Sequence, residues 1–159
     1  MPDAKFRFTQ PNSRGQFPIP CEIRLVHPDA RMPRRGKPSD AGYDIFSVAT
    51  VIIKPGETAA VPTGIELSVP EGLYYTMEGR SSLNRNKIFV VRPIIDATYT
   101  GEAEVLLRNE GDKSYTIESG DRPAQIILHS VLDMDFTTVE EFSPQYNKRG
   151  KAGWGSSGR

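Results

Sequence analysis

Residues 65–77 read IELSVPEGLYYTM, and this stretch contains the pattern that decides the fold class. Two short runs rich in β-branched and aromatic residues, Ile65–Val69 and Leu73–Met77, flank Pro70-Glu71-Gly72, a sequence that favours a tight turn. Runs of this length are too short for an ordinary helix, whereas they match the usual length of a strand. The stretch therefore predicts two strands joined by a turn.

The same combination recurs on both sides of residues 65–77. Other short runs of strand-forming residues are Cys21–His27, Val51–Lys54, Ile88–Val91, Val105–Arg108 and Gln125–Leu128. Turn-forming residues separate them at Pro55-Gly56, Thr100-Gly101, Glu110-Gly111-Asp112 and Gly120-Asp121. Many short strands with turns between them predict an all-β domain of the sandwich, jelly-roll or barrel type. Among these segments, Ser81–Asn86 alone is suited to a short helix.

The length and composition predict one domain with a polar segment at each end. A chain of 159 residues is long enough for a single domain with its own core. Residues 1–20 mix prolines with polar residues and predict an N-terminal arm, and residues 21–146 predict the β domain. Residues 147–159 are rich in glycine and predict a flexible C-terminal tail.

The charge and cysteine content exclude several classes of partner and site. Lys and Arg together number 20, as do Asp and Glu, so the neutral total gives no reason to expect nucleic acid or an anionic membrane as a partner. The single cysteine, Cys21, cannot form an internal disulfide. The sequence has neither a membrane-spanning apolar run nor a pattern typical of a signal peptide. We therefore expect a cytoplasmic protein, or a nuclear one in a eukaryotic or viral host, that is not secreted.

Two stretches in the middle of the chain combine residue types suited to phosphate chemistry. Gly79–Leu83 places an arginine and two serines where a strand passes into a short helix, which favours an anion site. In Ile94–Glu102, Asp96 ends an apolar run and Tyr99 follows just before a glycine turn. A carboxylate fixed there can accept a proton from water, and the tyrosine ring can pack on a sugar or a base. The alternatives are an ordinary helix cap, and a strand-ending aspartate with a core tyrosine.

Three further stretches are weaker when each is taken alone. Arg149–Gly158 (RGKAGWGSSG) could wrap an anion with backbone N–H groups, and Trp154, the single tryptophan, could stack on a base. A disordered tail or linker is the alternative for this stretch. Ala41–Asp44 predicts the start of a strand with a close-packed glycine and one acid. Gly120–Gln125 predicts a turn into a strand, with Gln125 either facing solvent or serving a site.

Taken in order, the five stretches resemble the five motifs of the trimeric dUTPase family, whose members cleave dUTP to dUMP and pyrophosphate. The matching segments are Ala41–Phe46, Gly79–Leu83, Ile94–Glu102, Gly120–Ile127 and Arg149–Gly158. The resemblance implies a distorted jelly-roll or β-clip barrel of short strands, with one short helix and a flexible glycine-rich C-terminal tail. It also implies a homotrimer in which the active sites are shared between subunits.

The resemblance further implies a role for each matched residue. Asp96 would be the general base that activates a water molecule for in-line attack on the α-phosphorus, assisted by Mg²⁺. Tyr99 would lie under the deoxyribose and exclude a 2′-hydroxyl, and Asp44 would position the hydrated Mg²⁺ through water. The remaining residues implied to bind substrate are Arg80, Ser81, Ser82 and Gln125 at the phosphates, Arg149, Gly153, Gly155, Ser156 and Ser157 in the closing tail, Trp154 on the base, and Ile94 and Ile95 in the base-binding hairpin.

One segment departs from the family pattern and leaves alternatives open. The hairpin leading to Asp96 is shorter than usual in the family, and Pro93 stands where a glycine is common. Proline has no N–H to donate, so the hydrogen bonds that recognise the nucleotide base must differ in detail from those usual in the family. Hydrolysis of dCTP or a modified dUTP is therefore an alternative, as is a non-catalytic binding or signalling protein on the same scaffold. Deamination of dCTP is disfavoured because Leu106 stands where that chemistry needs an acid.

Overall fold

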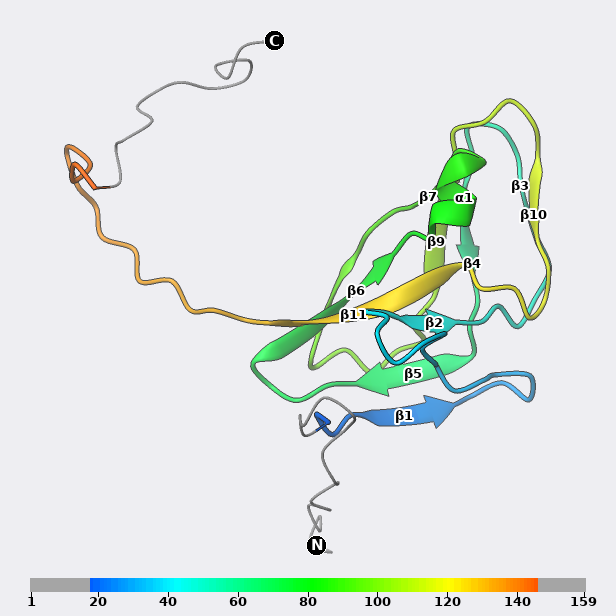
Figure 1. Cartoon of the computed structure of the whole chain (residues 1–159), viewed down its shortest axis with the longest axis horizontal. Coiled ribbons are helices and arrows are strands. Elements are labelled where there is room, and N and C mark those ends of the chain that lie inside the picture. The colour runs from blue at the N-terminus through cyan, green and yellow to red at the C-terminus, as the bar shows by residue number, and fades with distance from the viewer. Residues whose placement is uncertain (1–17, 146–159) are drawn as a thin grey trace, which may run out of the picture.

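Short antiparallel strands account for most of the regular structure in residues 18–145, the part of the chain that the computed structural model describes (Figure 1). One short helix interrupts them between β6 and β7. The elements in chain order are β1 Glu22–Leu25, β2 Tyr43–Ile45, β3 Val51–Ile53, β4 Thr58–Val61, β5 Ile65–Ser68, β6 Leu73–Glu78, α1 Ser81–Arg85, β7 Ile88–Val90, β8 Ile94–Asp96, β9 Val105–Asn109, β10 Tyr115–Ile117 and β11 Ala124–Ser130.

The strands form four small sheets, in which many neighbours are far apart in sequence. The largest sheet has the order β2-β11-β6-β8, and a second has the order β4-β9-β7. The pairs β1-β5 and β3-β10 complete the set, and every pairing is antiparallel. Strand β11, the last in the described part of the chain, lies between β2 and β6. The fold is all-β, as the sequence pattern predicted, and it is consistent with the distorted jelly roll that the family resemblance implied.

The predicted strands are confirmed to within a few residues at their ends, and two strands were not predicted. These are β4, whose sequence is TAAV, and β10, whose sequence is YTI. Alanine is a poor strand former, and a three-residue run gives too little alternation to be distinguished from a loop. Both segments are held in the extended conformation by pairing with another strand: β4 pairs with β9, and β10 pairs with β3.

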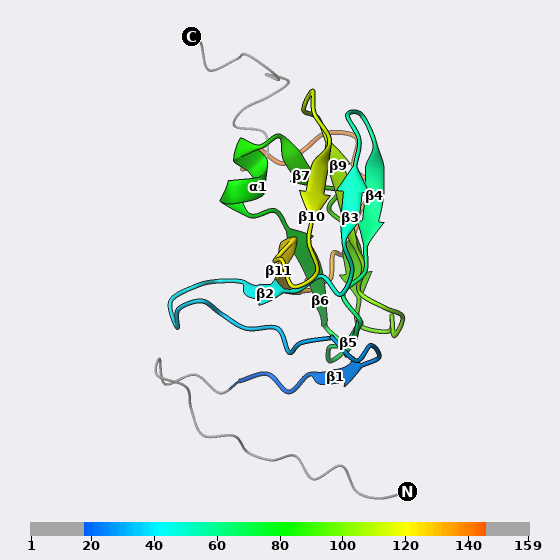
Figure 2. The same cartoon turned by 90° about the vertical axis from the view of Figure 1, so that its right-hand side faces the viewer.

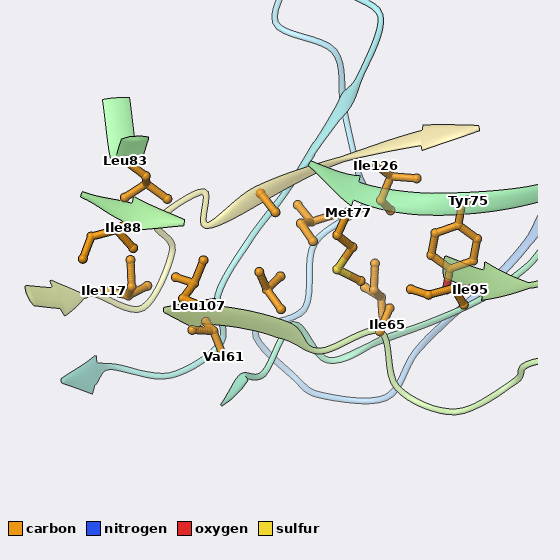
Figure 3. Packing of buried hydrophobic residues seen from close by; sticks show 14 of the residues in the cluster. Val61, Ile65, Tyr75, Met77, Leu83, Ile88, Ile95, Leu107, Ile117 and Ile126 are labelled. Carbon is orange, nitrogen blue, oxygen red and sulfur yellow. The ribbon is translucent and has the colours of Figure 1, made fainter. Parts of the chain in front are cut away.

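The core lies between the two larger sheets, where apolar side chains from each sheet meet (Figure 3). Tyr75 and Met77 of β6 are fully buried, and Leu107 of β9 is fully buried from the other side. Alternate residues of β9 point into the core, as expected for a strand with one covered face. Helix α1 adds Leu83 to the same core and packs beside β7 (Figure 2).

Tyr75 is a fully buried tyrosine whose hydroxyl has no hydrogen-bond partner within the described residues. Burial, and after it the nearby Tyr99, raise the pKa of Tyr75 from 10.0 to about 12. The pKa of Tyr75 is higher in the folded state than in the unfolded state. The contribution of the neutral hydroxyl to the free energy of unfolding is therefore fully present below pH 10. That contribution is lost as the pH rises from 10 towards 12.

Replacing Tyr75 with Phe is therefore expected to remove the loss of stability that ionisation of Tyr75 causes above pH 10. Near neutral pH the variant should match the wild type within about 1 kcal/mol, or exceed it, because the lost hydroxyl had no partner. At about pH 11 the variant should be the more stable protein. Urea unfolding at both pH values measures the difference. An equal loss of stability in the two proteins would contradict the assignment.

The chain leaves the body of the protein after β11. Figure 1 shows residues 132–145 as an extended orange segment that runs away from the strands. Leu132, Met134 and Phe136 alternate along it and are 82%, 73% and 83% exposed. Within residues 18–145 nothing covers these side chains. No helix within residues 18–145 has the length and apolar character needed to cross a bilayer.

Candidate active site

Two pockets contain the sequence-predicted site residues that fall within the described part of the chain. The first, here called the Asp96 pocket, has a volume of about 320 Å³ and lies at the β8–β9 connection. It is lined by Pro93, Ile94, Ile95, Asp96, Tyr99, Glu102, Ala103, Glu104 and Leu106. The second, the Arg80 pocket, has a volume of about 310 Å³. It is lined by Gly36, Asp40, Gly42, Asp44, Arg80, Ser81, Ser82, Arg122 and Gln125.

Asp96 is the last residue of β8 and is exposed at the edge of the largest sheet. Within residues 18–145 no hydrogen bond or ion pair engages its carboxylate. The carbonyl oxygen of Asp96 instead accepts a hydrogen bond of 3.1 Å from the N–H of Tyr99, which closes the turn after β8. A carboxylate held by its backbone, with both oxygens free, is suited to accept a proton from a bound water.

Tyr99 is 47% exposed, so the alternative that it is a core tyrosine is wrong. Its hydroxyl donates to the carbonyl oxygen of Glu102 at 3.2 Å, and its ring forms a wall of the Asp96 pocket. A flat ring anchored at its far end is a suitable platform for a sugar. This arrangement is compatible with the role that the resemblance implied for Tyr99.

The two isoleucines of β8 point in opposite directions. Ile94 is 69% exposed, whereas Ile95 belongs to the core and pairs with Tyr75 of β6. The side chain of Ile95 can therefore form only the floor of the pocket. Because β8 is an edge strand, the outer row of its backbone N–H and C=O groups has no partner strand within the described residues. These groups are available to hydrogen-bond a base.

The Arg80 pocket is organised by one carboxylate that holds two arginines. Asp44 Oδ1 lies 3.2 Å from Arg80 Nε, and Asp44 Oδ2 lies 3.0 Å from Arg122 Nη1. Arg80 Nη1 also donates to the carbonyl oxygen of Arg122 at 3.4 Å. The three side chains together carry one net positive charge, and most of the guanidinium N–H groups have no partner among the described residues. Such an array suits a phosphate or another oxyanion.

Arg80 is not the solvated cap of an ordinary helix. It occupies the N-cap position of α1, but a guanidinium has no acceptor with which to cap the helix, and this one lies against Asp44 instead. Ser81 and Ser82 follow in the first turn, are exposed, and line the same pocket. The first N–H groups of a helix are unpaired within it, so this turn adds donors to the two arginines.

Gln125 is half-buried and faces the Arg80 pocket rather than open solvent. It lies in β11 between Asp44 on one neighbour and Glu78 on the other. A Cβ atom at Gly42 would lie only 2.2 Å from Gln125 Oε1. Gly42 therefore leaves the room that the amide group occupies. The glycine in this stretch serves close packing, as the sequence predicted.

Sequence reasoning missed Arg122 as a site residue. It follows Gly120, whose φ of +88° needs a glycine, and this turn aims the arginine at Asp44. The one feature of the sequence that could have indicated a role for Arg122 was its positive charge within the fourth matching stretch, Gly120–Ile127. The predicted contacts of Arg149, Gly153, Trp154, Gly155, Ser156 and Ser157 lie outside the described residues and stay predictions, as do the segment boundaries at residues 20 and 146.

One chain does not bring the two pockets together. Asp44 is on β2 and Asp96 is on β8, the opposite edges of the sheet β2-β11-β6-β8. Along β6, Asp44 lies level with Glu78 and Asp96 lies level with Tyr74. With strands about 4.8 Å apart and a rise of about 3.4 Å per residue, the two Cα atoms are separated by about 20 Å. A single phosphate group cannot contact both carboxylates of one chain.

The sequence matches one known protein family over most of its length. The family model described as dUTPase matches residues 28–158. The deoxyuridine 5'-triphosphate nucleotidohydrolase of Clostridium tetani is 35% identical over 141 residues, which cover 87% of this chain and 96% of that protein. The enzyme of the same name from Paramecium bursaria Chlorella virus 1 is 39% identical over 137 residues, with coverage of 86% and 96%.

Solved structures of phage enzymes share the fold. A variant dUTPase of Staphylococcus bacteriophage 80alpha with dUpNHpp has a TM-score of 0.80 and 30% identity, and the match covers 88% of this chain and 99% of that one. A variant dUTPase of phage phi11 of S. aureus, described as coordinating a structural Mg(II) ion, has a TM-score of 0.71 and 29% identity, with coverage of 77% and 98%. The identities, the coverage and the order of the matching residues agree, and the chain belongs to the dUTPase family.

Proposed function

We propose that this protein hydrolyses dUTP to dUMP and pyrophosphate by attack of water on the α-phosphorus. The observation that carries the proposal is the exposed carboxylate of Asp96, which has no partner within residues 18–145, beside the anchored ring of Tyr99, in a chain of the dUTPase family. An unpaired carboxylate beside a flat ring suits the activation of water next to a bound deoxynucleotide.

In the proposed reaction Asp96 accepts a proton from a water molecule as its oxygen attacks the α-phosphorus. The bond between the α-phosphorus and the oxygen bridging to the β-phosphorus breaks, and pyrophosphate leaves with that electron pair. Arg80, Arg122, Gln125 and the hydroxyls of the serines in α1 neutralise and hold the phosphate oxygens. The arginines are already gathered on Asp44, so little reorganisation is needed when the polyphosphate binds.

The residues present fit a hydrated Mg²⁺ that arrives on the triphosphate. Both oxygens of Asp44 already contact arginines, and residues 18–145 hold no group of three or more side chains that could cage an ion. Mg²⁺ usually keeps several waters and binds through few carboxylates together with substrate phosphates. When bound, the ion supplies charge neutralisation at the phosphates, and Asp44 would hold it through water.

We place the base against β8, where Ile94, Ile95 and the free backbone edge lie. Tyr99 would pack against the deoxyribose and leave no room for a 2′-hydroxyl. The glycine-rich tail, with Arg149, Ser156 and Ser157 at the phosphates and Trp154 on the base, would close over the bound nucleotide and exclude bulk water. The tail would serve the site of another subunit.

A homotrimer with shared sites is part of the proposal. The separation of about 20 Å between the Cα atoms of Asp44 and Asp96 supports a complete site built from more than one copy of the chain. The exposed apolar side chains of residues 132–142 support association as well. A closed ring of three copies would pair each Asp96 pocket with an Arg80 pocket of a neighbour.

A pyrophosphate-release assay with dUTP, dCTP, dTTP and UTP, with and without Mg²⁺, tests the proposed function. We expect rapid release from dUTP in the presence of Mg²⁺, and kcat/KM values at least about 100-fold lower for the other three nucleotides. Release mainly from dCTP would assign a related pyrophosphatase, which the short hairpin at Pro93 leaves room for. No release from any nucleotide would refute the proposal and favour a binding protein.

A further inference from the structure

Glu102 ties the turn after β8 to a distant part of the chain. Its carboxylate oxygen Oε1 accepts two hydrogen bonds, from the N–H of Thr63 at 3.0 Å and from the N–H of Gly64 at 2.7 Å. Two successive backbone N–H groups that converge on one oxygen form a small anion-binding site. Hydrogen bonds to a charged acceptor are the stronger kind, so this contact holds the Glu102 side chain in one place.

A second pair of contacts runs parallel to the first. The hydroxyl of Thr63 donates to the carbonyl oxygen of Ala103 at 2.8 Å, and the N–H of Ala103 donates to the carbonyl oxygen of Ile65 at 2.8 Å. Thr63 and Ala103 are each 1% exposed. Buried hydrogen bonds of this kind resist exchange with water, so the backbone at Glu102 and Ala103 is fixed at both ends.

The partner segment of Glu102 cannot move to follow it. Gly64 has a φ of +65°, and a Cβ atom there would lie 2.5 Å from the Cβ of His27 and 3.0 Å from the Cβ of Ala30. The turn is therefore packed from outside as well as constrained in its own conformation. The N–H groups of Thr63 and Gly64, which donate to the carboxylate, are therefore held in a fixed position.

The other side of Glu102 carries Tyr99. The Tyr99 hydroxyl donates to the Glu102 carbonyl oxygen at 3.2 Å, and a Cβ atom at Gly101 would lie 2.5 Å from that hydroxyl oxygen. The tyrosine side chain thus folds back over Gly101 and rests on the backbone that the Glu102 carboxylate fixes. Any shift of that backbone would be passed to the ring at the wall of the Asp96 pocket.

We propose that Glu102 is a positioning residue, whose carboxylate sets the place of the Tyr99 ring and thereby the discrimination between deoxyribonucleotides and ribonucleotides. This inference rests on the proposed function and adds a residue to it. The carboxylate itself need not touch the nucleotide, because it acts through the backbone and Tyr99. The selectivity for the sugar then depends on the position of Glu102 Oε1 as a hydrogen-bond acceptor and not on the charge of the carboxylate.

Three substitutions at position 102 separate these properties. For Glu102→Ala we expect the ratio of kcat/KM for dUTP to that for UTP to fall about tenfold, because the acceptor of both N–H groups is gone. Glu102→Gln keeps an oxygen at the same reach and should retain the ratio within about threefold. Glu102→Asp keeps the charge but is one methylene shorter, so it should resemble the alanine variant.

The matched control is Glu118→Ala. The Glu118 carboxylate accepts a hydrogen bond of 3.0 Å from the Thr50 hydroxyl and lines neither pocket. The Glu118→Ala variant therefore shows the effect of losing a carboxylate that holds a loop away from both pockets. Its ratio of kcat/KM for dUTP to that for UTP should equal that of the wild type. Should Glu102→Ala fail to fold, Thr63→Val removes the parallel contact to Ala103 with nearly unchanged shape, and the ratio is expected to fall in the same way.

The affinities for non-hydrolysable analogues of dUTP and UTP, measured by calorimetry on the same proteins, complete the test. If the wild type hydrolyses no nucleotide, the proposed function fails, and the ratio of these two affinities still tests Glu102. A folded Glu102→Ala protein with the wild-type ratio in both assays would overturn the positioning role. So would a Glu102→Gln protein as unselective as the alanine variant, because charge would then be the deciding property.

Discussion

The Asp96→Asn variant is expected to lose about 10²- to 10⁴-fold in kcat for dUTP, the usual contribution of a well-placed general base. Asparagine has the same shape but cannot accept the proton of the attacking water at neutral pH. Within residues 18–145 the Asp96 carboxylate makes no hydrogen bond or ion pair, so its loss should not disturb the fold. The affinity for a non-hydrolysable dUTP analogue should therefore stay within about threefold of the wild type.

Steady-state kinetics and calorimetry on the Asp96→Asn protein measure these two quantities separately. Glu104→Gln is the matched control, because Glu104 is a second exposed carboxylate in the same pocket. We expect its kcat to fall by less than about tenfold. A loss in Glu104→Gln as large as that in Asp96→Asn, or a parallel loss of turnover and affinity in Asp96→Asn, would contradict the assignment of the base.

Two inactive variants are expected to regain activity when they assemble together. Arg80→Ala should be nearly inactive because it removes a phosphate ligand and leaves Asp44 with one arginine. Each site of the proposed trimer takes Asp96 from one copy and Arg80 from another. In every trimer that contains both kinds of chain, one neighbouring pair combines an intact Asp96 with an intact Arg80 in the required order, so about a third of the sites should be complete.

Co-expression of the two variants with different affinity tags, followed by purification through both tags, isolates the mixed assemblies. The control replaces the Arg80→Ala chain with a chain that carries both substitutions, and such mixtures contain no complete site. Activity near a third of the wild-type value would support shared sites. If the mixed assemblies stayed as inactive as their parents, each site would have to come from a single chain.

The sequence predicted the local structure better than the contacts between distant segments. Turn residues such as Pro70-Glu71-Gly72 and strand-forming runs act within a few residues, so β5, β6 and the start of α1 lie where they were expected. The strand β4 was missed because its alanines carry little preference of their own, and it is held as a strand by β9. Pairing across the chain decided the state of that segment.

The same limit applies to the candidate site. Asp96, Tyr99, Arg80 and Gln125 could be named from the sequence because each belongs to a stretch with a recognisable pattern. Arg122 could not be assigned a role, since its value depends on a carboxylate that lies 78 residues away in the chain. Glu102 is a similar case, because nothing near it in sequence indicates that the N–H groups that donate to its carboxylate belong to Thr63 and Gly64. Such roles emerge only once the sheets are assembled.

In the proposed trimer, the extended segment after β11 would make the stability of each chain depend on its neighbours. A solitary chain would keep Leu132 and Phe136 in water and gain nothing from ordering them. If the proposed trimer covers these side chains, the stability and the activity of the protein should both rise with its concentration. Below the concentration at which the proposed trimer forms, the activity should fall more steeply than the amount of protein.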